Sequence, residues 1–327
     1  MKALQLTRAS ANVPPELSMA DLPIPQLTPG HALVRIHYAS IQPSDRLNTQ
    51  GLFPHTTFPR VPGRDYSGTV VDIVGDSMES QSWIGKMVYG TSGSSLGFDI
   101  DGTNAEYCLV PETALVEKPA SLSSIQAATV GVPFTTAMIC LQRAQVKADD
   151  VVLVLGANGA VGSAVTQMAR AMGCRRVLTA ARHGDPKPDV VLGSVVSIET
   201  TLPALTDGKG VDVVIDTVGD LALMASAIAQ LAVKGRYAWI TAPRGEASKE
   251  LTFNVFQAYR KEISLLGCNS VARTLEDTAG YLRSMNGWIE QGLLEAPNDA
   301  VFVTVKLDDA IDDGYGKSAP KVVIDML

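Results

Sequence analysis

The stretch that decides the fold is Val151-Val152-Leu153-Val154-Leu155-Gly156-Ala157-Asn158-Gly159-Ala160-Val161-Gly162. Its first five residues are apolar and predict a strand that is buried on both faces. Three glycines spaced GxxGxxG follow, and Ser163 to Met172 then has a helical pattern. A glycine turn between a strand and a helix is typical of dinucleotide-binding sites, although a tight turn without a ligand has the same local pattern.

The residues of this turn have separate tasks in binding a pyrophosphate. Gly159 lets the backbone approach the phosphates, and Gly162 lets the helix pack closely against the strand. The N-terminus of the helix offers free amide groups and the positive end of its dipole. The residues of this segment that we expect to bind the dinucleotide are Gly156, Asn158, Gly159, Ala160, Val161 and Gly162.

The residues after the second strand favour NADPH over NADH. A free ribose 2′-hydroxyl is usually held by Asp or Glu about 20 residues past the glycine turn, whereas a 2′-phosphate needs a cation. Here Ala181, Arg182 and His183 stand at the end of the strand Arg176–Ala181, and the first acid is Asp185. The Arg182 guanidinium has a fork of donors that matches a phosphate. We therefore predict NADPH as the cofactor, with a solvated surface role for Arg182 as the alternative.

Strands and helices alternate along this half of the chain. Val211 to Asp216 predicts a strand, Leu221 to Val233 a helix, and Arg236 to Thr241 and Ile263 to Gly267 two more strands. Continuous apolar strands separated by helix-length segments indicate a parallel sheet that is covered on both faces. This half is therefore predicted to be a doubly wound α/β domain.

The N-terminal third has a different pattern. Pro and Gly divide it into short apolar pieces such as Ala32–Ile36 and Gly68–Val74, which predicts a β-rich domain. The C-terminal tail carries a helical stretch, Leu275 to Gln291, and two strand-like pieces, Val301–Val305 and Lys321–Asp325. Those two strands have no place in the nucleotide domain, so we expect the tail to complete the first domain. The expected domain ranges are 1–122, 123–268 and 269–327.

Length and composition argue against several classes of protein. With 327 residues the chain is long enough for about two domains. Its 27 Lys and Arg and 34 Asp and Glu give a net charge of −7, which disfavours nucleic-acid binding. We expect a cytoplasmic protein that does not bind membranes, because there is no apolar run of membrane-spanning length and no secretion signal at the N-terminus. The four cysteines are too widely spaced for a structural zinc site or a disulfide framework: Cys108, Cys140, Cys174 and Cys268.

Five motifs in order carry a resemblance to a known family. They are Pro62–Val70, Gly102–Tyr107, Thr136-Ala137, the turn that begins at Gly156, and Gly210–Gly219. Together they resemble the zinc-independent, quinone oxidoreductase-like branch of the medium-chain dehydrogenase/reductase superfamily, over nearly the full length of the chain. The resemblance implies a GroES-like β-rich catalytic domain, interrupted by a Rossmann domain and resumed by the C-terminal tail.

The same resemblance implies further contacts and an assembly. Additional residues expected to contact the cofactor are Thr136, Val218, Thr241, Gly267 and Cys268. A homodimer is implied, formed through the sheet edge near Ile263 to Cys268.

One departure from the family lies between Arg182 and Leu192, where relatives usually have a helix. Gly184, Pro186 and Pro188 fall in this stretch, and two prolines so close together cannot sit inside a regular helix. We expect this wall of the adenine pocket to be short and irregular.

The positions of the catalytic zinc ligands are changed. Zinc-dependent relatives place a Cys and a His-Glu pair where this chain has Ile41–Asp45 and Arg64-Asp65. Thiolate and imidazole ligands are both missing there, so we predict no metal site and no zinc-assisted alcohol oxidation. Hydride transfer from NADPH to a quinone or an α,β-unsaturated carbonyl compound remains as the expected reaction.

Three side chains are the candidates for polarising the acceptor. Tyr66, Ser44 and Gln42 are expected to donate a hydrogen bond to the oxygen on which charge develops. A packed core aromatic is the alternative for Tyr66. Arg64 either attracts the substrate or pairs with Asp45 or Asp65 in a structural role.

Two other functions are compatible with the same motifs. An enoyl-thioester reductase uses a similar hydride step. A non-catalytic protein that binds NADPH and senses it would keep the cofactor site without turnover.

Overall fold

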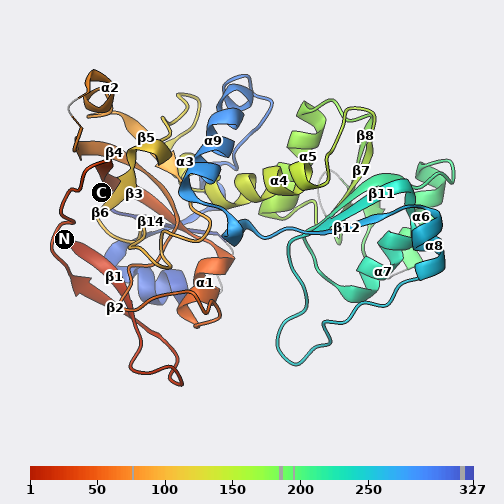
Figure 1. Cartoon of the computed structure of the whole chain (residues 1–327), viewed down its shortest axis with the longest axis horizontal. Coiled ribbons are helices and arrows are strands. Elements are labelled where there is room, and N and C mark those ends of the chain that lie inside the picture. Colours follow the sequence, from red (N-terminus) through yellow and green to blue (C-terminus); the bar gives the residue numbers. More distant parts are fainter. Residues whose placement is uncertain (76, 184–186, 194–195, 317–320) are drawn as a thin grey trace. The chain divides into compact units, whose positions relative to one another are not determined.

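The structure is a computed structural model that describes residues 1–75, 77–183, 187–193, 196–316 and 321–327 (Figure 1). The chain divides into two compact units, one formed by Met1–Thr135 with Val271–Leu327 and the other by Thr136–Ser270. The domain limits expected from the sequence, at 122/123 and 268/269, stay predictions. Gly184, Asp185 and Pro186, which belong to the irregular connection expected after Arg182, lie outside the described residues.

The second unit is built on a parallel sheet of six strands in the order β12-β11-β10-β7-β8-β9. The strands are β7 (Val151–Leu155), β8 (Arg176–Ala181), β9 (Val190–Val191), β10 (Val211–Asp216), β11 (Leu231–Trp239) and β12 (Ser264–Gly267). From β7 the chain adds strands first on one side and then, starting with β10, on the other. The carboxyl ends of β7 and β10 are therefore a topological switch point, where open α/β sheets bind ligands.

Helices accompany the strands of this unit, and all of those described except the last contribute buried residues. They are α4 (Gly131–Arg143, which begins in the first unit), α5 (Ala160–Ala171), α6 (Val196–Leu205), α7 (Leu221–Ala229) and α8 (Val255–Arg260). Every residue of β7 is buried, as the apolar run Val151–Leu155 predicted. The helix predicted over Leu221–Val233 is wrong at its end, because the backbone leaves the helix at Ala229 and Leu231 pairs with Val211 of β10.

The first unit contains most of the β-structure that precedes residue 123. Its strands are β1 (Lys2–Thr7), β2 (Glu16–Asp21), β3 (His31–Ile41), β4 (Asp65–Ile73), β5 (Met87–Gly90), β6 (Tyr107–Pro111), β13 (Val303–Lys306) and β14 (Val322–Asp325). β1 and β2 form a hairpin, and the others form one sheet in the order β13-β14-β3-β4-β5, with β6 also on β3. Because β14 pairs antiparallel with β3, the C-terminal strands join the N-terminal ones.

Helices connect and cover the strands of this unit. They are α1 (Pro43–Thr49), α2 (Met78–Gln81), α3 (Ser124–Ala127) and α9 (Leu275–Glu290). α9 begins where a capping box predicts it, since Thr274 and Asp277 bond each other's backbone N–H groups. The strand predicted from Val301 begins at Val303 instead, because Asn298 caps a 3-10 turn over Asp299–Val301.

The predicted fold class is confirmed by this architecture, an α/β protein with a β-rich unit and a doubly wound parallel sheet. None of the described helices is long and apolar enough to cross a membrane.

A substitution at the point where α5 crosses the turn after β7 tests how tightly the second unit is packed. A Cβ atom at Gly162 would lie 2.8 Å from the Gly156 carbonyl carbon and 2.9 Å from the Ala157 Cα. Both are backbone atoms that must shift to make room. We expect Gly162→Ala to lower the free energy of unfolding by about 1–3 kcal/mol, measured by urea denaturation.

Gly280→Ala is the matched control for this variant. Gly280 also lies inside a helix, but a Cβ there would meet nothing within 4 Å. It should raise the stability by up to about 1 kcal/mol, because alanine is the better helix former. An equal gain at Gly162 would contradict the close crossing.

Candidate functional site

A cavity of about 870 Å³ opens at the carboxyl ends of β7 and β10 in the second unit. Its walls come from the turns and loops that follow β7, β8, β9 and β10, and from the first turn of α7. The lining residues are Gly156, Asn158, Gly159, Ala181, Arg182, His183, Leu192, Gly193, Thr217, Val218, Asp220, Ala222 and Leu223. The cavity therefore lies at the switch point of the sheet.

The glycine turn leaves the backbone open toward this cavity. Gly156 has φ +79°, a left-handed conformation, and a Cβ there would lie 3.0 Å from the Val218 Cγ2 atom. Gly159 occupies the N-cap of α5. The first amide groups of a helix have no partner within the helix, so the N-terminus of α5 offers free donors beside the turn.

Seven of the residues predicted to bind the cofactor line the cavity. They are Gly156, Asn158, Gly159, Ala181, Arg182, His183 and Val218. Ala160 and Val161 form the first turn of α5, and Gly162 packs beneath it against Gly156.

The other four predicted cofactor residues lie elsewhere in the second unit. Thr241, Gly267 and Cys268 stand at or just after the ends of β11 and β12. Thr136 lies in α4, and its buried hydroxyl has no hydrogen-bond partner within the described part of the chain.

Sequence reasoning missed several lining residues. Thr217 and Asp220 flank the predicted Val218, and the rule that ligands bind at strand carboxyl ends would have found them. Leu192 and Gly193 follow β9, a strand of two residues that no periodicity can reveal.

The charges around the cavity favour an anionic ligand. Arg182 is exposed and, among the residues that the structure describes, has no hydrogen-bond or ion-pair partner. The Asp220 carboxylate accepts the Leu223 N–H at 2.9 Å as the cap of α7, and the Asp189 carboxylate accepts two bonds from Thr179 at 2.8 Å. Neither acid is paired with Arg182.

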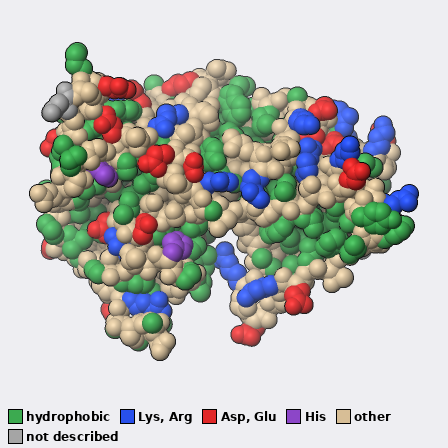
Figure 2. Space-filling view, in the orientation of Figure 1, with side chains coloured by type: hydrophobic (Ala, Val, Ile, Leu, Met, Phe, Trp, Pro, Cys, Tyr) green, Lys and Arg blue, Asp and Glu red, His purple; other side chains and the backbone are tan. Residues whose placement is uncertain are grey.

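The two units differ in charge. Residues 136–270 carry 14 Lys and Arg against 12 Asp and Glu, whereas the rest of the chain carries 13 against 22. Figure 2 shows Lys and Arg side chains over the part of the view that α5 and β8 occupy in Figure 1. The acidic balance of the chain thus comes from the first unit, and the unit with the cavity is slightly basic.

A buried carboxylate holds the turn after β10. Asp216 is fully buried and accepts the Val218 N–H at 2.7 Å, the Gly219 N–H at 3.1 Å and the Tyr237 hydroxyl at 2.8 Å. Burial raises the pKa of Asp216, and the three donors oppose that rise. These bonds fix the backbone at Val218, which forms part of the cavity wall.

The first unit contains a second buried carboxylate, Asp65. It accepts the Gln42 side-chain amide at 2.8 Å and the Val132 N–H, at the start of α4, at 3.0 Å. Burial raises the pKa of Asp65 to about 6, against the opposing effects of the Arg64 charge and the Val132 N–H bond. Asp65 thus joins β4, the segment before α1 and the N-terminus of α4.

Arg64 forms the other half of this polar cluster. Its side chain is 1% exposed, and it donates to the Asp45 carboxylate at 2.9 Å and to the Ser44 hydroxyl. Its guanidinium lies over the Phe98 ring, 5.4 Å from the centroid. Of the two structural partners weighed for Arg64, the salt bridge that the structure shows is the one to Asp45.

The structure brings together two of the three catalytic candidates. Gln42 and Ser44 both belong to the Arg64–Asp65 cluster. Tyr66 alternates with Asp65 along β4 and points to the opposite face of the sheet. Its hydroxyl is buried against Gly90 without a hydrogen-bond partner in the described part of the chain, and burial raises its pKa.

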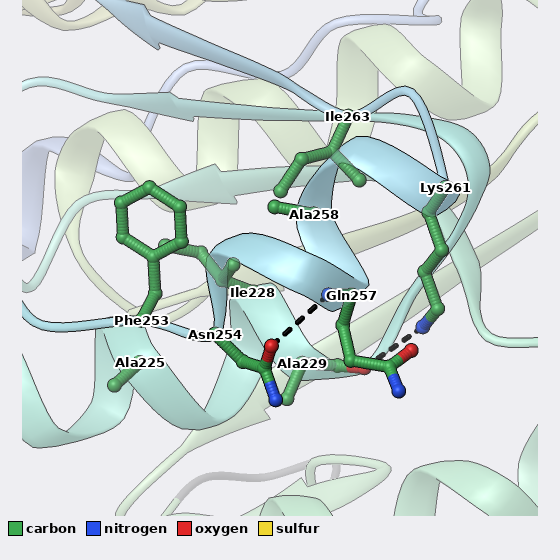
Figure 3. Close-up of a pocket in the computed structure, with 9 residues that line it drawn as sticks. All are labelled: Ala225, Ile228, Ala229, Phe253, Asn254, Gln257, Ala258, Lys261 and Ile263. Atoms are coloured by element: carbon green, nitrogen blue, oxygen red, sulfur yellow. Dashed lines mark hydrogen bonds between the residues drawn. The ribbon is translucent and has the colours of Figure 1, made fainter.

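A smaller pocket of about 170 Å³ lies beneath α8 (Figure 3). Its walls are mostly apolar, among them Ile228, Phe253 and Ile263. The Lys261 ammonium turns back to the carbonyls of Ala229, at 3.0 Å, and Leu231, at 2.7 Å. Lys261 is the one cation among the described residues that line this pocket, and its bonds are made to carbonyls at the C-terminal end of α7 and just beyond it. None of the predicted site residues is among those lining residues.

No group of three or more His, Cys, Asp or Glu side chains within the described ranges is placed to hold a metal ion.

Comparisons with known proteins relate both units to one group of enzymes. Residues 28–120 match the family model for the alcohol dehydrogenase GroES-like domain, and residues 160–286 match that for zinc-binding dehydrogenases. A zinc-type alcohol dehydrogenase-like protein of Schizosaccharomyces pombe is 42% identical over 312 residues, which cover 95% of this chain and 92% of that protein. Human quinone oxidoreductase is 27% identical over 317 residues, 93% of this chain and 92% of that protein. The crystal structure of an alcohol dehydrogenase superfamily protein from Novosphingobium aromaticivorans superposes over the whole of both chains with a TM-score of 0.81 at 26% identity.

The raised pKa of Asp65 predicts a pH-dependent stability. Its folded-state pKa of about 6 lies above the ordinary value of 3.8 for an aspartate, so the stability that the protonated form contributes is present below pH 4 and is lost as the pH rises through 6. We expect the difference in unfolding free energy between the wild type and Asp65→Asn to fall by up to about 3 kcal/mol between pH 4 and pH 7. Urea denaturation across this range measures it.

Asp72→Asn is the control, because Asp72 lies on the same strand but is exposed. The difference in unfolding free energy between Asp72→Asn and the wild type should not change with pH. If the difference for Asp65→Asn does not change either, the pKa of Asp65 is not raised in the folded protein.

Proposed function

The chain belongs to the medium-chain dehydrogenase/reductase superfamily, and on this basis we propose that it is a zinc-independent, NADPH-dependent oxidoreductase. We further propose that it reduces quinones or α,β-unsaturated carbonyl compounds. The observation that carries the proposal is the cavity at the switch point, where the glycine turn meets an arginine without an acidic partner among the described residues.

The residues of the cavity fit a phosphorylated dinucleotide. Gly156 and Gly159 have no side chains, so the backbone beside the N-terminus of α5 is open to a ligand. Pyrophosphate groups bind at helix N-termini of this kind. Arg182 would hold the ribose 2′-phosphate through its fork of donors, and His183 stands beside it. The unpartnered Thr136 hydroxyl is a further polar group available to the cofactor.

The donor set in the first unit supports chemistry without zinc. Arg64 stands at a ligand position of the zinc enzymes, and a guanidinium has no lone pair to offer a metal. The nearby carboxylates of Asp45 and Asp65 are already occupied by Arg64, Gln42 and Val132.

When bound, reduced nicotinamide supplies a hydride, which is two electrons and one hydrogen nucleus. The acceptor gains this hydride at one end of its conjugated system, and negative charge develops on its carbonyl oxygen until a proton from water completes the reduction. The protein's part is to orient the acceptor and stabilise that charge. We propose Ser44 as the polar side chain at the acceptor, with Gln42 beside it in the same cluster, and the buried position of Tyr66 favours its core role.

The cofactor choice is tested by titrating the protein with NADPH and NADH by fluorescence. We expect Arg182→Ala to weaken NADPH binding about 10- to 100-fold and to change NADH binding less than about threefold, because the lost bonds are to the 2′-phosphate. Arg170→Ala is the control, since Arg170 is exposed at the far end of α5. Equal loss for both cofactors would contradict the assignment of Arg182.

Turnover is tested by adding 1,4-naphthoquinone or phenyl vinyl ketone to the NADPH complex. Oxidation of NADPH is the expected result. Binding without turnover of any quinone or enone would favour the sensor, and failure to bind either cofactor would overturn the proposal.

We also propose a homodimer formed through β12, and a cytoplasmic location, with which the four cysteines agree because none of them forms a disulfide. β12 is an edge strand of the six-stranded sheet, and within the described residues it pairs only with β11. The Cys268 N–H donates to the Trp239 carbonyl at 2.8 Å, so alternation points the N–H of Leu265 toward the free edge.

The dimer is tested by sedimentation equilibrium over a range of concentrations. We expect the wild type to be dimeric and Leu265→Pro, which removes an N–H from the free edge, to shift the equilibrium toward the monomer. Circular dichroism confirms that the variant is folded. A wild type that stays monomeric at all concentrations would contradict this assembly.

A further inference from the structure

The polar cluster of the first unit leaves one hydrogen-bond donor unused. Gln42 has two amide hydrogens, and its Nε2 atom already donates to the Ser40 hydroxyl at 3.0 Å and to the Asp65 carboxylate at 2.8 Å. The Ser44 hydroxyl accepts a bond from Arg64 and donates to no acceptor within the described residues. Of the two candidates in the cluster, only Ser44 therefore has a hydrogen to give to a ligand.

The Arg64 guanidinium is held in one orientation. Its Nε–H donates to one oxygen of the Asp45 carboxylate at 2.9 Å, and the other oxygen of that carboxylate accepts the Gln42 backbone N–H at 2.8 Å. The side chains of Arg64 and Asp45 are 1% and 3% exposed, so neither charge can turn out to water. A buried pair of this kind is strongly destabilised when one partner is lost, which keeps the geometry fixed.

This fixed cation acts on Ser44. Because the Nη2 group of Arg64 occupies a lone pair of the Ser44 oxygen, the O–H bond of Ser44 points away from the guanidinium. A hydroxyl that accepts a charge-assisted bond is polarised and becomes a stronger donor itself. Ser44 is also partly exposed, whereas the Arg64 side chain is 1% exposed, so of these two residues only Ser44 has surface that a ligand can contact.

We propose that Ser44 donates the hydrogen bond to the carbonyl oxygen of the acceptor, and that Arg64, held by Asp45, is the positioning residue that orients and polarises it. The inference rests on the proposed function. As the acceptor carbon receives the hydride, the electron pair of the C=C bond shifts to the bond next to the carbonyl carbon, and the π electron pair of the C=O bond moves onto the oxygen. Ser44 stabilises that charge and keeps its own proton, and water supplies the proton that completes the reduction.

The first test removes the hydroxyl. We expect Ser44→Ala to lower kcat about a hundredfold with 1,4-naphthoquinone and phenyl vinyl ketone, the scale of losing one donor to a developing oxyanion. Ser44→Thr keeps the hydroxyl and should retain activity within about fivefold. NADPH affinity should be unchanged in both variants, and Ser284→Ala, on the exposed face of α9, should match the wild type in every respect.

The second test asks whether Arg64 acts through Ser44. Arg64→Lys cannot bond Asp45 and Ser44 in the same fork, so we expect a kcat loss of at least tenfold. In the Ser44→Ala background the same substitution should cause no further loss, because the group it positions is gone. Losses that simply multiply would overturn the positioning role.

A third measurement covers the case in which Arg64→Lys does not fold. With para-substituted phenyl vinyl ketones, the loss caused by Ser44→Ala should grow as the substituent makes the enolate oxygen more basic. A loss independent of the substituent would overturn the role of Ser44.

The outcomes separate the two proposals. If the wild type reduces the acceptors and Ser44→Ala does so equally well, this inference is wrong and the proposed function stands. If the wild type binds NADPH but reduces no acceptor, the proposed reaction and this inference fail together.

Discussion

The close approach of α5 to the end of β7 is the constraint on which the cavity at the switch point of the second unit depends. Gly162 and Gly156 meet with no room for a Cβ between them, which brings the N-terminus of α5 directly to the carboxyl end of the strand. Thr217 and Val218 pack against the same turn from β10. One backbone contact thus places the glycine turn, the free amides of α5 and the opposite wall of the cavity.

In each unit a buried carboxylate accepts hydrogen bonds from backbone N–H groups and so fixes a connecting segment of the chain. In the second unit Asp216 binds the amides of Val218 and Gly219, and in the first unit Asp65 binds the amide of Val132. Burial disfavours the charged form of each, so these groups have raised pKa values although they receive several hydrogen bonds. Stability and site geometry therefore depend on the same few bonds.

In our proposal, the Arg64–Asp45 pair stands where zinc-dependent relatives have metal ligands. A guanidinium cannot bind zinc, but a buried one can present a fixed positive charge to a neighbouring hydroxyl. The bonds to Asp45 and the contact with Phe98 keep this charge away from water. In our proposal the charge reaches the acceptor through Ser44 and not by direct contact.

The sequence by itself determined the strand Val151–Leu155, the glycine turn, the doubly wound sheet and the place of Arg182, because each depends on local patterns of apolar residues, glycines and charge. It could not determine that Leu231 leaves the helix for a strand, since pairing with β10 outweighs local helical preference. Nor could it separate Ser44 from Tyr66. That choice depends on which hydrogens are already used and on which face of β4 a side chain occupies, and only the packed tertiary structure decides both.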